Sequence, residues 1–183
     1  MWLDSDANVH HNVFIGGDNN RGGLYNTYGN TGILIQNNTL DGRGGTGAGD
    51  NALYVTGSET ATSNLFMNLP YTPIKVVSGT LSADYNLFWN SASPSYDDLR
   101  APIHDVHADP LLASPAAHAY ELDEKAVWQR TQSVHDVLSA YRAKYLPKAG
   151  SPVLGSGDPA ISGAGNHIGA IGDGTRAEDR FGK

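Results

Sequence analysis

The chain has 183 residues, a formal net charge of −7 and no cysteine, and its length is that of one ordinary domain. The lack of cysteine excludes disulfides and thiolate metal sites. The acidic balance argues against nucleic acid or an anionic membrane surface as a partner, and it weakens the case for a polyanionic substrate such as pectate or alginate unless calcium or a local basic patch bridges it. We predict no membrane span, because there is no run of about 18 apolar residues, and we expect no signal peptide, because no basic, apolar leader is visible.

A repeated string organises residues 1–113, which we predict to form the coils of a solenoid. Four asparagines recur at intervals of 26, 26 and 22 residues, each with a large apolar residue two positions after it and an apolar or small residue three positions before it. A period of this length is typical of solenoids. We call these residues the ladder asparagines: Asn12, Asn38, Asn64 and Asn86.

We expect the ladder asparagines to lie in one buried line, one in each of at least four stacked coils. Asparagine suits a sharp bend because it tolerates left-handed backbone angles. A buried amide needs partners, so each side-chain amide is expected to bond to that of the next coil. The flanking residues would then form two interior columns: Val9, Ile35, Ala61 and Ala83 before the asparagines, and Phe14, Leu40, Phe66 and Phe88 after them.

A second set of strands is predicted at residues 2–4, 24–27, 53–56 and 74–77. Side chains alternate between the two faces of a strand, so taking Leu24, Leu53 and Ile74 as inward leaves one outward column. A register slip of one residue would exchange the two faces. The outward column consists of Trp2, Tyr25, Tyr54 and Lys75.

The pattern changes after the repeats. Residues 92–113 hold three prolines and are interpreted as irregular chain that closes the coil stack. Apolar residues recur at helical spacing within 114–150, which we interpret as a helical cap or insertion, with a partner-binding helix as the alternative. Residues 151–172 are expected to return as a last strand that closes the solenoid, and 173–183 to form a frayed tail.

Two features of the sequence resemble known proteins. The asparagine repeat looks like the right-handed parallel β-helix of pectate lyases, many polysaccharide lyases and several glycoside hydrolase families. Residues 108–112, 146–157 and 168–170 are similar to the ending that many bacterial β-helix proteins of the secreted and surface class share. The resemblance implies an all-β solenoid, a single-stranded right-handed parallel β-helix with a C-terminal helical appendage, located outside the cell or on its surface.

The start of the chain already reads as a strand inside a coil, with no polar cap before Trp2. An uncapped solenoid end exposes core and unpaired strand edges. We therefore expect the chain to be the C-terminal portion of a longer β-helix, with the missing N-terminal coils as a partner. Alone, we expect it to be marginally stable or to associate through this end.

The outward column is a candidate binding surface. Parallel strands lie about 4.8 Å apart, so Trp2, Tyr25 and Tyr54 would form a continuous aromatic face of the kind that binds sugar rings. The alternative is that further coils, a loop or another chain cover this apolar face.

Asp4 and Asp6 are the candidate catalytic residues. Residues 2–4 are similar to the strand that carries the nucleophilic aspartate of family 120 glycoside hydrolases, the β-xylosidases, and residues 32–39 to a stretch just after their acid/base glutamate. The resemblance implies that Asp4 is a nucleophile or base and that Thr27 stands at the acid position. Threonine cannot protonate a leaving group, so either the acid lies elsewhere or the chain is not that enzyme, and Thr27 is a substrate-binding candidate.

His10 is a further substrate-binding candidate. It falls in an outward column with Gln36, Thr62 and Asp84, where it is either an acid/base or sugar-binding group or part of an ordinary polar surface.

Three other clusters have a structural and a functional interpretation. Glu59 and Asp50 are possible second carboxylates or solvated loop residues. Residues 104–109 hold two histidines and two aspartates, which could bind a metal but which we interpret as a turn. Residues 44–50 resemble the calcium-binding nonapeptide of bacterial toxins, with one residue too many and in a single copy, so we interpret them as a loop.

These features together predict a carbohydrate-active protein. The function we favour is a glycoside hydrolase, or a polysaccharide lyase, that acts on plant or microbial polysaccharide, with an incomplete active site in this chain. The alternative is a non-catalytic polysaccharide-binding or adhesin-like surface β-helix. We expect polysaccharide or oligosaccharide as the partner, no metal in the catalytic site and no cofactor, with calcium the one ion left open.

Overall fold

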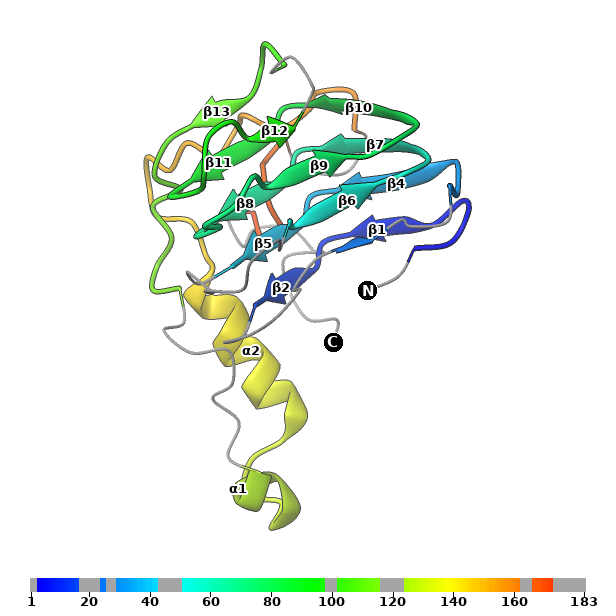
Figure 1. The fold of residues 1–183 in the computed structure, drawn as a ribbon. Helices are drawn as coiled ribbons and strands as arrows, with labels where there is room; N and C mark the ends of the chain where they lie inside the picture. The colour runs from blue at the N-terminus through cyan, green and yellow to red at the C-terminus, as the bar shows by residue number, and fades with distance from the viewer. Residues whose placement is uncertain are drawn as a thin grey trace.

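The computed structural model describes residues 3–16, 24–25, 29–42, 51–97, 102–115, 124–161 and 166–172, and gives only the backbone of Leu24, Tyr25, Asp97 and Glu124. These residues are mostly short β-strands in parallel sheets, with two short helices (Figure 1). The architecture of the described part is therefore mainly β, as the sequence predicts.

The strands form three sheets, and every strand pairing in them is parallel. The first sheet contains, in spatial order, β1 (Asn8–His10), β4 (Ile33–Gln36), β7 (Ser58–Thr62) and β10 (Thr80–Asp84). The second contains β2 (Val13–Ile15), β5 (Thr39–Asp41), β8 (Leu65–Met67), β11 (Leu87–Trp89) and β13 (Val106–His107). The third contains β3 (Leu24–Tyr25), β6 (Leu53–Val55), β9 (Ile74–Val76) and β12 (Tyr96–Asp97).

Each strand pairs with the strand that occupies the same place in the next repeat, so the repeats stack as levels. We call the end of the sheets formed by β1, β2 and β3 the lower end, and the opposite end, formed by β10, β12 and β13, the upper end, as they appear in Figure 1; β13 lies one level above β10 and β12 because it pairs with β11. The register confirms both predicted interior columns, since Val9 pairs with Ile35 and Phe14 with Leu40, and the higher members follow in the same register.

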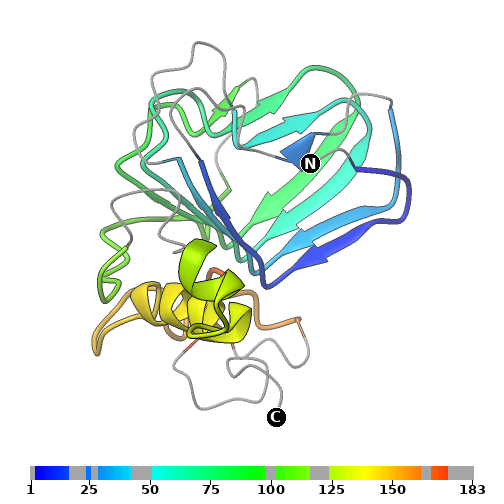
Figure 2. The same ribbon diagram turned by 90° about the horizontal axis from the view of Figure 1, so that it is seen from below.

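The main core lies between the three sheets, which surround a common interior when the molecule is seen from below (Figure 2). Its side chains come from all three sheets, for example Ile35 from the first, Phe66 from the second and Leu53 from the third, and each of these is fully buried. The rings of Phe66 and Phe88 stack with centroids 5.1 Å apart. Alternate residues of each strand thus supply the apolar burial that stabilises the sheets.

The ladder asparagines form the predicted line of side-chain amides. Oδ1 of Asn38 accepts Nδ2–H of Asn12 at 3.1 Å, and the same bond recurs at 3.1 Å from Asn38 to Asn64 and from Asn64 to Asn86. Three of the four are fully buried, whereas Asn12 at the lower end is exposed. The predicted ladder is therefore confirmed, with its lowest member at the surface.

The bend itself is made differently from our prediction. The left-handed backbone angle belongs to the residue before each ladder asparagine and not to the asparagine, with φ between 50° and 57°. Asn12, Asn38 and Asn64 instead donate Nδ2–H to the carbonyl two residues earlier, as Asn64 does to Thr62 at 3.1 Å. The asparagine side chain therefore holds the bend closed from the inside. The left-handed residues are His11, Asn37, Ser63 and Tyr85.

A second core covers the outer face of the second sheet. Leu65, Met67 and Leu87 pack there against the C-terminal part of the chain, including Val153 and Ile168. The described residues of 151–172 contain no strand, only the isolated antiparallel bridge between Leu154 and His167. The expected returning strand is thus replaced by an irregular covering segment, because its prolines and glycines remove donors and break extended pairing.

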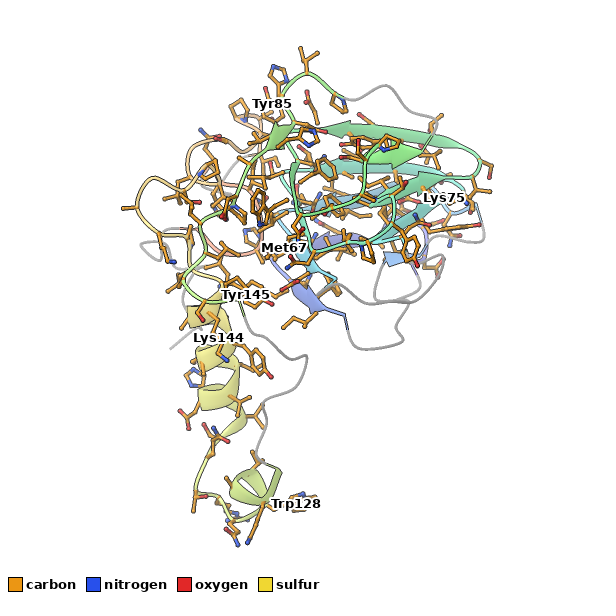
Figure 3. The ribbon with its side chains drawn as sticks, turned by 60° about the vertical axis from the view of Figure 1, so that its left-hand side comes forward. Met67, Lys75, Tyr85, Trp128, Lys144 and Tyr145 are labelled. Carbon is orange, nitrogen blue, oxygen red and sulfur yellow. The ribbon has the colours of Figure 1, made fainter. Side chains whose placement is uncertain are left out.

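The described residues of the appendage form two helices, α1 (Glu124–Trp128) and α2 (Val134–Lys144). Ser133 interrupts the helical pattern because it begins α2 as an N-cap, in a capping box with Asp136. Both helices extend away from the sheets (Figure 1), and Trp128, 86% exposed, lies at the far tip (Figure 3). Neither described helix is long and apolar enough to cross a membrane.

Candidate functional site

The outer face of the first sheet carries regular polar columns. The register places His10, Gln36, Thr62 and Asp84 in one outward column, as predicted. A parallel column on the same face contains Asn8, Leu34, Thr60 and Ser82. Hydroxyl groups face one another across adjacent strands, and Oγ1 of Thr80 donates to Oγ of Ser58 at 3.1 Å. This face therefore presents amide and hydroxyl groups at the spacing of the strands, about 4.8 Å.

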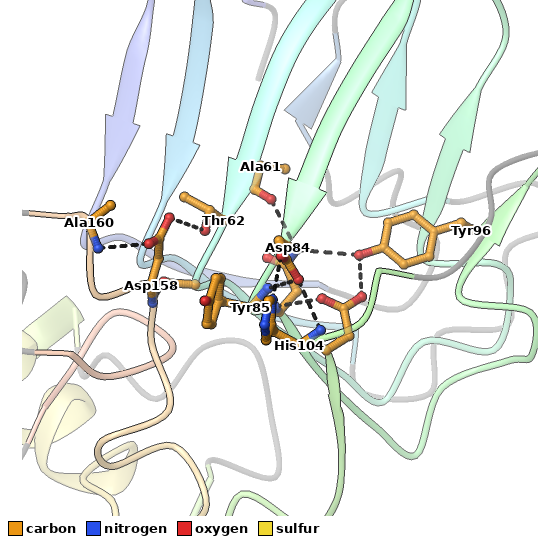
Figure 4. Close-up of polar contacts among 11 residues, drawn as sticks. Ala61, Thr62, Asp84, Tyr85, Tyr96, His104, Asp158 and Ala160 are labelled. Atoms are coloured by element: carbon orange, nitrogen blue, oxygen red, sulfur yellow. Dashed lines mark hydrogen bonds and ion pairs between the residues drawn. The ribbon is translucent and has the colours of Figure 1, made fainter.

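Asp84 and His104 form a hydrogen-bonded pair at the upper end of the His10 column (Figure 4). Oδ2 of Asp84, the last residue of β10, is 2.7 Å from Nδ1 of His104. Oδ1 accepts the backbone N–H of Tyr85 at 3.0 Å and that of His104 at 3.1 Å. The rings of His104 and Tyr85 stack with centroids 4.4 Å apart and an interplanar angle of 5°. These contacts hold the imidazole in one orientation.

The contacts of His104 leave one of its ring nitrogens without a partner among the described residues. An ionised carboxylate only accepts hydrogen bonds, so Nδ1 carries the proton toward Asp84 and Nε2 is left to act. Nε2 bonds to none of the residues that the structure describes, and the side chains of His104 and Asp84 are 46% and 35% exposed. Burial raises the pKa of Asp84, but the hydrogen bonds from His104 and Tyr85 together outweigh it, so the pKa lies below its ordinary value.

The C-terminal segment covers the middle of this column. Oδ2 of Asp158 accepts the hydroxyl of Thr62 at 3.3 Å, and its Oδ1 accepts the backbone N–H of Ala160 at 2.8 Å. The backbone N–H of Asp158 donates to Oγ of Ser63 at 2.8 Å (Figure 4). Thr62 is consequently buried. Asp158 therefore fastens this segment to the edge of the polar face, beside Asp84.

Asp105 belongs to the ladder. Its Oδ1 accepts the backbone N–H of Asn86 at 2.9 Å, the bond that a ladder asparagine makes, and its Oδ2 accepts the hydroxyl of Tyr96 at 2.6 Å. Burial raises the pKa of Asp105, and the hydrogen bonds from Tyr96 and Asn86 oppose this without cancelling it. Burial, together with the Asp105 charge, also raises the pKa of Tyr96.

The metal interpretation of residues 104–109 finds no support in the described part of the chain, where no group of three or more acidic or histidine side chains could hold an ion. Asp109 makes a turn, because its Oδ1 accepts the backbone N–H of Leu111 at 2.8 Å. The turn interpretation is therefore confirmed for Asp109, whereas Val106 and His107 form β13. Asp50 and the loop 44–50 lie outside the described residues.

A second polar line escaped the sequence analysis. Oδ1 of Asp41 accepts Nδ2–H of Asn68 at 2.8 Å, and Oδ1 of Asn68 accepts Nδ2–H of Asn90, also at 2.8 Å. The hydroxyl of Tyr145 donates to Oδ2 of Asp41 at 2.8 Å and so ties the end of α2 to the second sheet. The signal was present in the sequence, since an Asp or Asn stands three or four residues after three of the ladder asparagines.

Asp4 and Asp6 are both exposed, in the chain that leads into β1. Oδ1 of Asp4 accepts the backbone N–H of Ser5 at 2.9 Å. The residue beside this stretch on the next level is Asn30, whose Nδ2–H donates to the carbonyl of Leu3 at 2.7 Å. Asn30, like Thr27, cannot protonate a leaving group, and Thr27 itself lies outside the described residues.

The aromatic column is described only in part. The backbone register pairs Tyr25 with Tyr54 and Tyr54 with Lys75, as predicted. Tyr54 is half-buried. The side chain of Tyr25 and the whole of Trp2 lie outside the described residues, so the continuous aromatic face stays a prediction.

His10 and Glu59 have different surroundings. His10 is exposed at the end of β1, with its Nδ1 3.1 Å from Nδ1 of His11. Glu59 is not a solvated loop residue: it lies in β7, is 4% exposed, and pairs in register with Ile33 and Leu81. The loop interpretation failed because Glu59 stands at an inward position of the strand, in alternation with Ala61.

The chain matches no family model, no curated protein and no solved structure. Its function therefore has to be inferred from the geometry of its own residues.

Proposed function

We propose that the stacked levels form a right-handed parallel β-helix, each level being one coil. The strands of the first, second and third sheets follow one another in the chain and then recur one level higher. The ladder bonds join adjacent levels at the same bend in every repeat. Connections between parallel strands of one sheet are right-handed in almost all proteins, which supports this hand of winding.

On this fold we propose that the outer face of the first sheet binds an extended polysaccharide. Amide and hydroxyl side chains both donate and accept hydrogen bonds, which matches the chemistry of sugar hydroxyls. The columns run across the strands, so a glycan that lies along a column meets one set of polar groups per coil. Ser58, Thr80 and Ser82 are exposed on this face.

The Asp84–His104 pair is the proton-transfer group of the proposed site. Nε2 of His104 is directed away from Asp84 by the geometry of the ring and has no described partner. A histidine fixed in one tautomer by a carboxylate is a suitable general base. This pair, at the end of a polar column, is the observation that carries the proposal.

Among glycan reactions, the geometry favours elimination, the reaction of a polysaccharide lyase, over hydrolysis. A glycoside hydrolase needs two carboxyl groups, one of which stays protonated, but the pKa of Asp84 is lowered and both oxygens of Asp158 accept hydrogen bonds. Elimination needs one base: Nε2 takes the proton next to the uronate carbonyl, a carbon–carbon double bond forms, and the glycosidic carbon–oxygen bond breaks. The leaving oxygen then takes a proton from water.

A non-catalytic glycan-binding β-helix is the second candidate. Several carboxylates of the described residues have structural roles: Asp41 holds α2, Asp105 ends the ladder, and Asp109 and Asp158 hold turns. The family 120 resemblance implies Asp4 as nucleophile, but the described residue that contacts this stretch from the next level is Asn30, through the carbonyl of Leu3, and it is not an acid. A protein of this kind would bind the same polysaccharides and release no product.

The test is a screen of the full chain against xylan, pectin, alginate and fucosylated glycans. Elimination yields unsaturated, ultraviolet-absorbing products, whereas hydrolysis yields reducing ends alone. We expect His104→Gln to abolish the unsaturated product, and Asp84→Asn to reduce it at least about tenfold, because an orienting carboxylate is worth that much to a general base. The controls are Asp4→Asn and His135→Gln, a histidine of α2 (Val134–Lys144).

The outcomes separate the candidates. Loss of product with Asp4→Asn but not with Asp84→Asn would move the chemistry to the site implied by the family 120 resemblance. Binding without any product in the unmodified chain would leave the non-catalytic protein. The absence of both binding and product for every glycan would refute the carbohydrate proposal.

A further inference from the structure

The two ends of the ladder have different hydrogen-bonding chemistry. Oδ1 of Asn38, Asn64 and Asn86 each accepts two hydrogens from the asparagine one level below, the backbone N–H and one Nδ2–H, at 2.9 to 3.1 Å. The bonds between ladder side chains are thus directional: each amide oxygen accepts from the asparagine one level below, although the Nδ2–H groups of Asn38, Asn64 and Asn86 also donate to backbone carbonyls of the level below.

The upper end is chemically closed. Asp105 accepts the backbone N–H of Asn86, but its side chain has no N–H that could donate to a further ladder residue above it. The interior stack of rings ends there as well, since His107 lies over Phe88 with ring centroids 5.5 Å apart and Phe88 is 3% exposed.

Within the part of the chain that the structure describes, neither the ladder nor the ring stack is closed at the lower end. Asn12 donates Nδ2–H to Asn38 and to the carbonyl of His10, but its Oδ1 accepts no hydrogen from any described residue. Phe14, the lowest member of its interior column, is half-buried, whereas Leu40 directly above it is 1% exposed. β1, β2 and β3 are also the end strands of their sheets.

We infer that a further coil stacks beneath β1, β2 and β3 and carries an asparagine at the ladder position. The backbone N–H and Nδ2–H of that asparagine would donate to Oδ1 of Asn12, as Asn12 itself donates to Asn38. Apolar residues on the two sides of its bend would extend the columns that end in Val9 and Phe14. Oδ1 of Asn12 needs a hydrogen-bond donor and the half-buried ring of Phe14 needs an apolar neighbour, so a coil that supplies both fits this surface better than a polar loop does.

The occupant is the polypeptide that leads into residue 3. Leu3 is 4% exposed, and its carbonyl accepts Nδ2–H of Asn30 at 2.7 Å. The carbonyl of Asn30 in turn accepts the backbone N–H of Ser58 at 3.1 Å. Leu3, Asn30 and Ser58 therefore lie on consecutive levels, so the chain enters β1 from the side from which it enters β7. A coil joined ahead of Leu3 consequently falls beneath β1.

A second copy of the chain fits this surface less well. Two lower ends placed face to face would set Oδ1 of one Asn12 against Oδ1 of the other, and both atoms are acceptors. An upper end placed beneath a lower end would offer the backbone N–H of Asp105 but no side-chain N–H. Each interior Oδ1 of the ladder accepts two N–H groups, and contact between two copies of the chain would give Oδ1 of Asn12 at most one.

The test joins a copy of residues 53–74 directly ahead of Met1 in the full chain. This copy contains the sequences of β6, β7 and β8, and its ladder asparagine precedes Asn12 by 22 residues, the interval between Asn64 and Asn86. The matched control carries Asn64→Asp in the copied segment alone, which removes the side-chain donor. Asn12→Ala in the original chain, with and without the extension, completes a double-mutant cycle.

Amide hydrogen exchange in β1 and β2 is the readout, because it reports local opening of the lowest level. We expect the asparagine extension to slow exchange there at least about tenfold, and the aspartate extension or Asn12→Ala to remove most of that gain. Equal slowing by both extensions would refute the ladder complementarity, and no slowing by either would refute stacking. Sedimentation of the unextended chain checks the occupant, since end-to-end association that Asn12→Ala abolishes would show that a second copy takes this place.

Discussion

Replacing Asn64 by alanine tests the ladder at its centre. Oδ1 of Asn64 accepts the backbone N–H of Asn38 at 3.0 Å and its Nδ2–H at 3.1 Å. Nδ2–H of Asn64 reaches the carbonyl of Ile35 at 2.9 Å and Oδ1 of Asn86 at 3.1 Å. The amide therefore joins three levels at a site that no water reaches, since Asn64 is 0% exposed.

The size of the effect follows from what the substitution leaves behind. Nδ2 of Asn38 keeps its bonds to the carbonyls of Val9 and Gln36, but the buried backbone N–H of Asn38 loses its side-chain acceptor. One orphaned buried donor costs about 1–3 kcal/mol, and the lost bonds to Ile35 and Asn86 add about 1 kcal/mol. We therefore expect Asn64→Ala to lower the free energy of unfolding by about 2–4 kcal/mol.

Equilibrium urea unfolding of the full chain, followed by circular dichroism, measures this loss. The matched control is Asn12→Ala, which removes the same side chain at the exposed end of the ladder. We expect it to cost less than about 1 kcal/mol, because Oδ1 of Asn38 keeps the backbone N–H of residue 12 and the carbonyl of the exposed His10 can bond to water. Equal losses at the two positions would refute the claim that burial gives the ladder its energy.

Three further predictions concern a bend, the appendage and the end of the ladder. Gly79 has φ of +83°, and a Cβ atom at this position would collide with the carbonyl oxygen of Gly57, whereas Gly150 has φ of +81° and open space around it. In thermal unfolding, Gly79→Ala should therefore lower the free energy of unfolding by about 2 kcal/mol or more, and Gly150→Ala by only about 1 kcal/mol. Equal losses would contradict the role of the close approach between Gly79 and Gly57. Tyr145→Phe removes the O–H donor to Asp41, and we expect faster amide exchange in α2 but unchanged exchange in the first sheet; unchanged α2 exchange would argue against its role as a tether. The pKa of Asp105 is raised in the folded state, so its contribution to stability is full below the ordinary value of 3.8 and is lost as the pH rises through the folded-state pKa. We expect Asp105→Asn to abolish this component in urea titrations at several pH values, and a pH profile identical to that of the unmodified chain would overturn the assignment.

The repeat made the stacking predictable, because the spacing of residues and the alternation of strands are properties of the sequence. The register of Val9, Phe14 and Tyr54 with their counterparts follows from these two rules alone. The left-handed residue of each bend did not follow from them. Ser63 and Tyr85 adopt positive φ although neither is a typical left-handed residue, since the bonds on both sides of the bend determine their angles.

The candidate site was less predictable, because its parts come from distant segments. Asp84 and His104 stand 20 residues apart, and Thr62 and Asp158 stand 96 apart. Asp84 appeared in the sequence only as a member of the His10 column, and His104 only as part of a possible metal cluster. Bringing them together requires the course of the chain that enters β13, for which neither periodicity nor a motif offers a rule.

The connections between strands differ in one further way that bears on engineering. The first and second sheets are joined by two residues in all four described bends, whereas the second and third sheets are joined by 8, 11, 6 and 6 residues. The short bends carry the ladder, so their length cannot change without breaking the amide line. The connection at residues 90–95 joins β11 to β12 and is not one of the bends that carry the ladder. We therefore expect a foreign peptide inserted there to be displayed without a change in the strand register, which the ladder maintains.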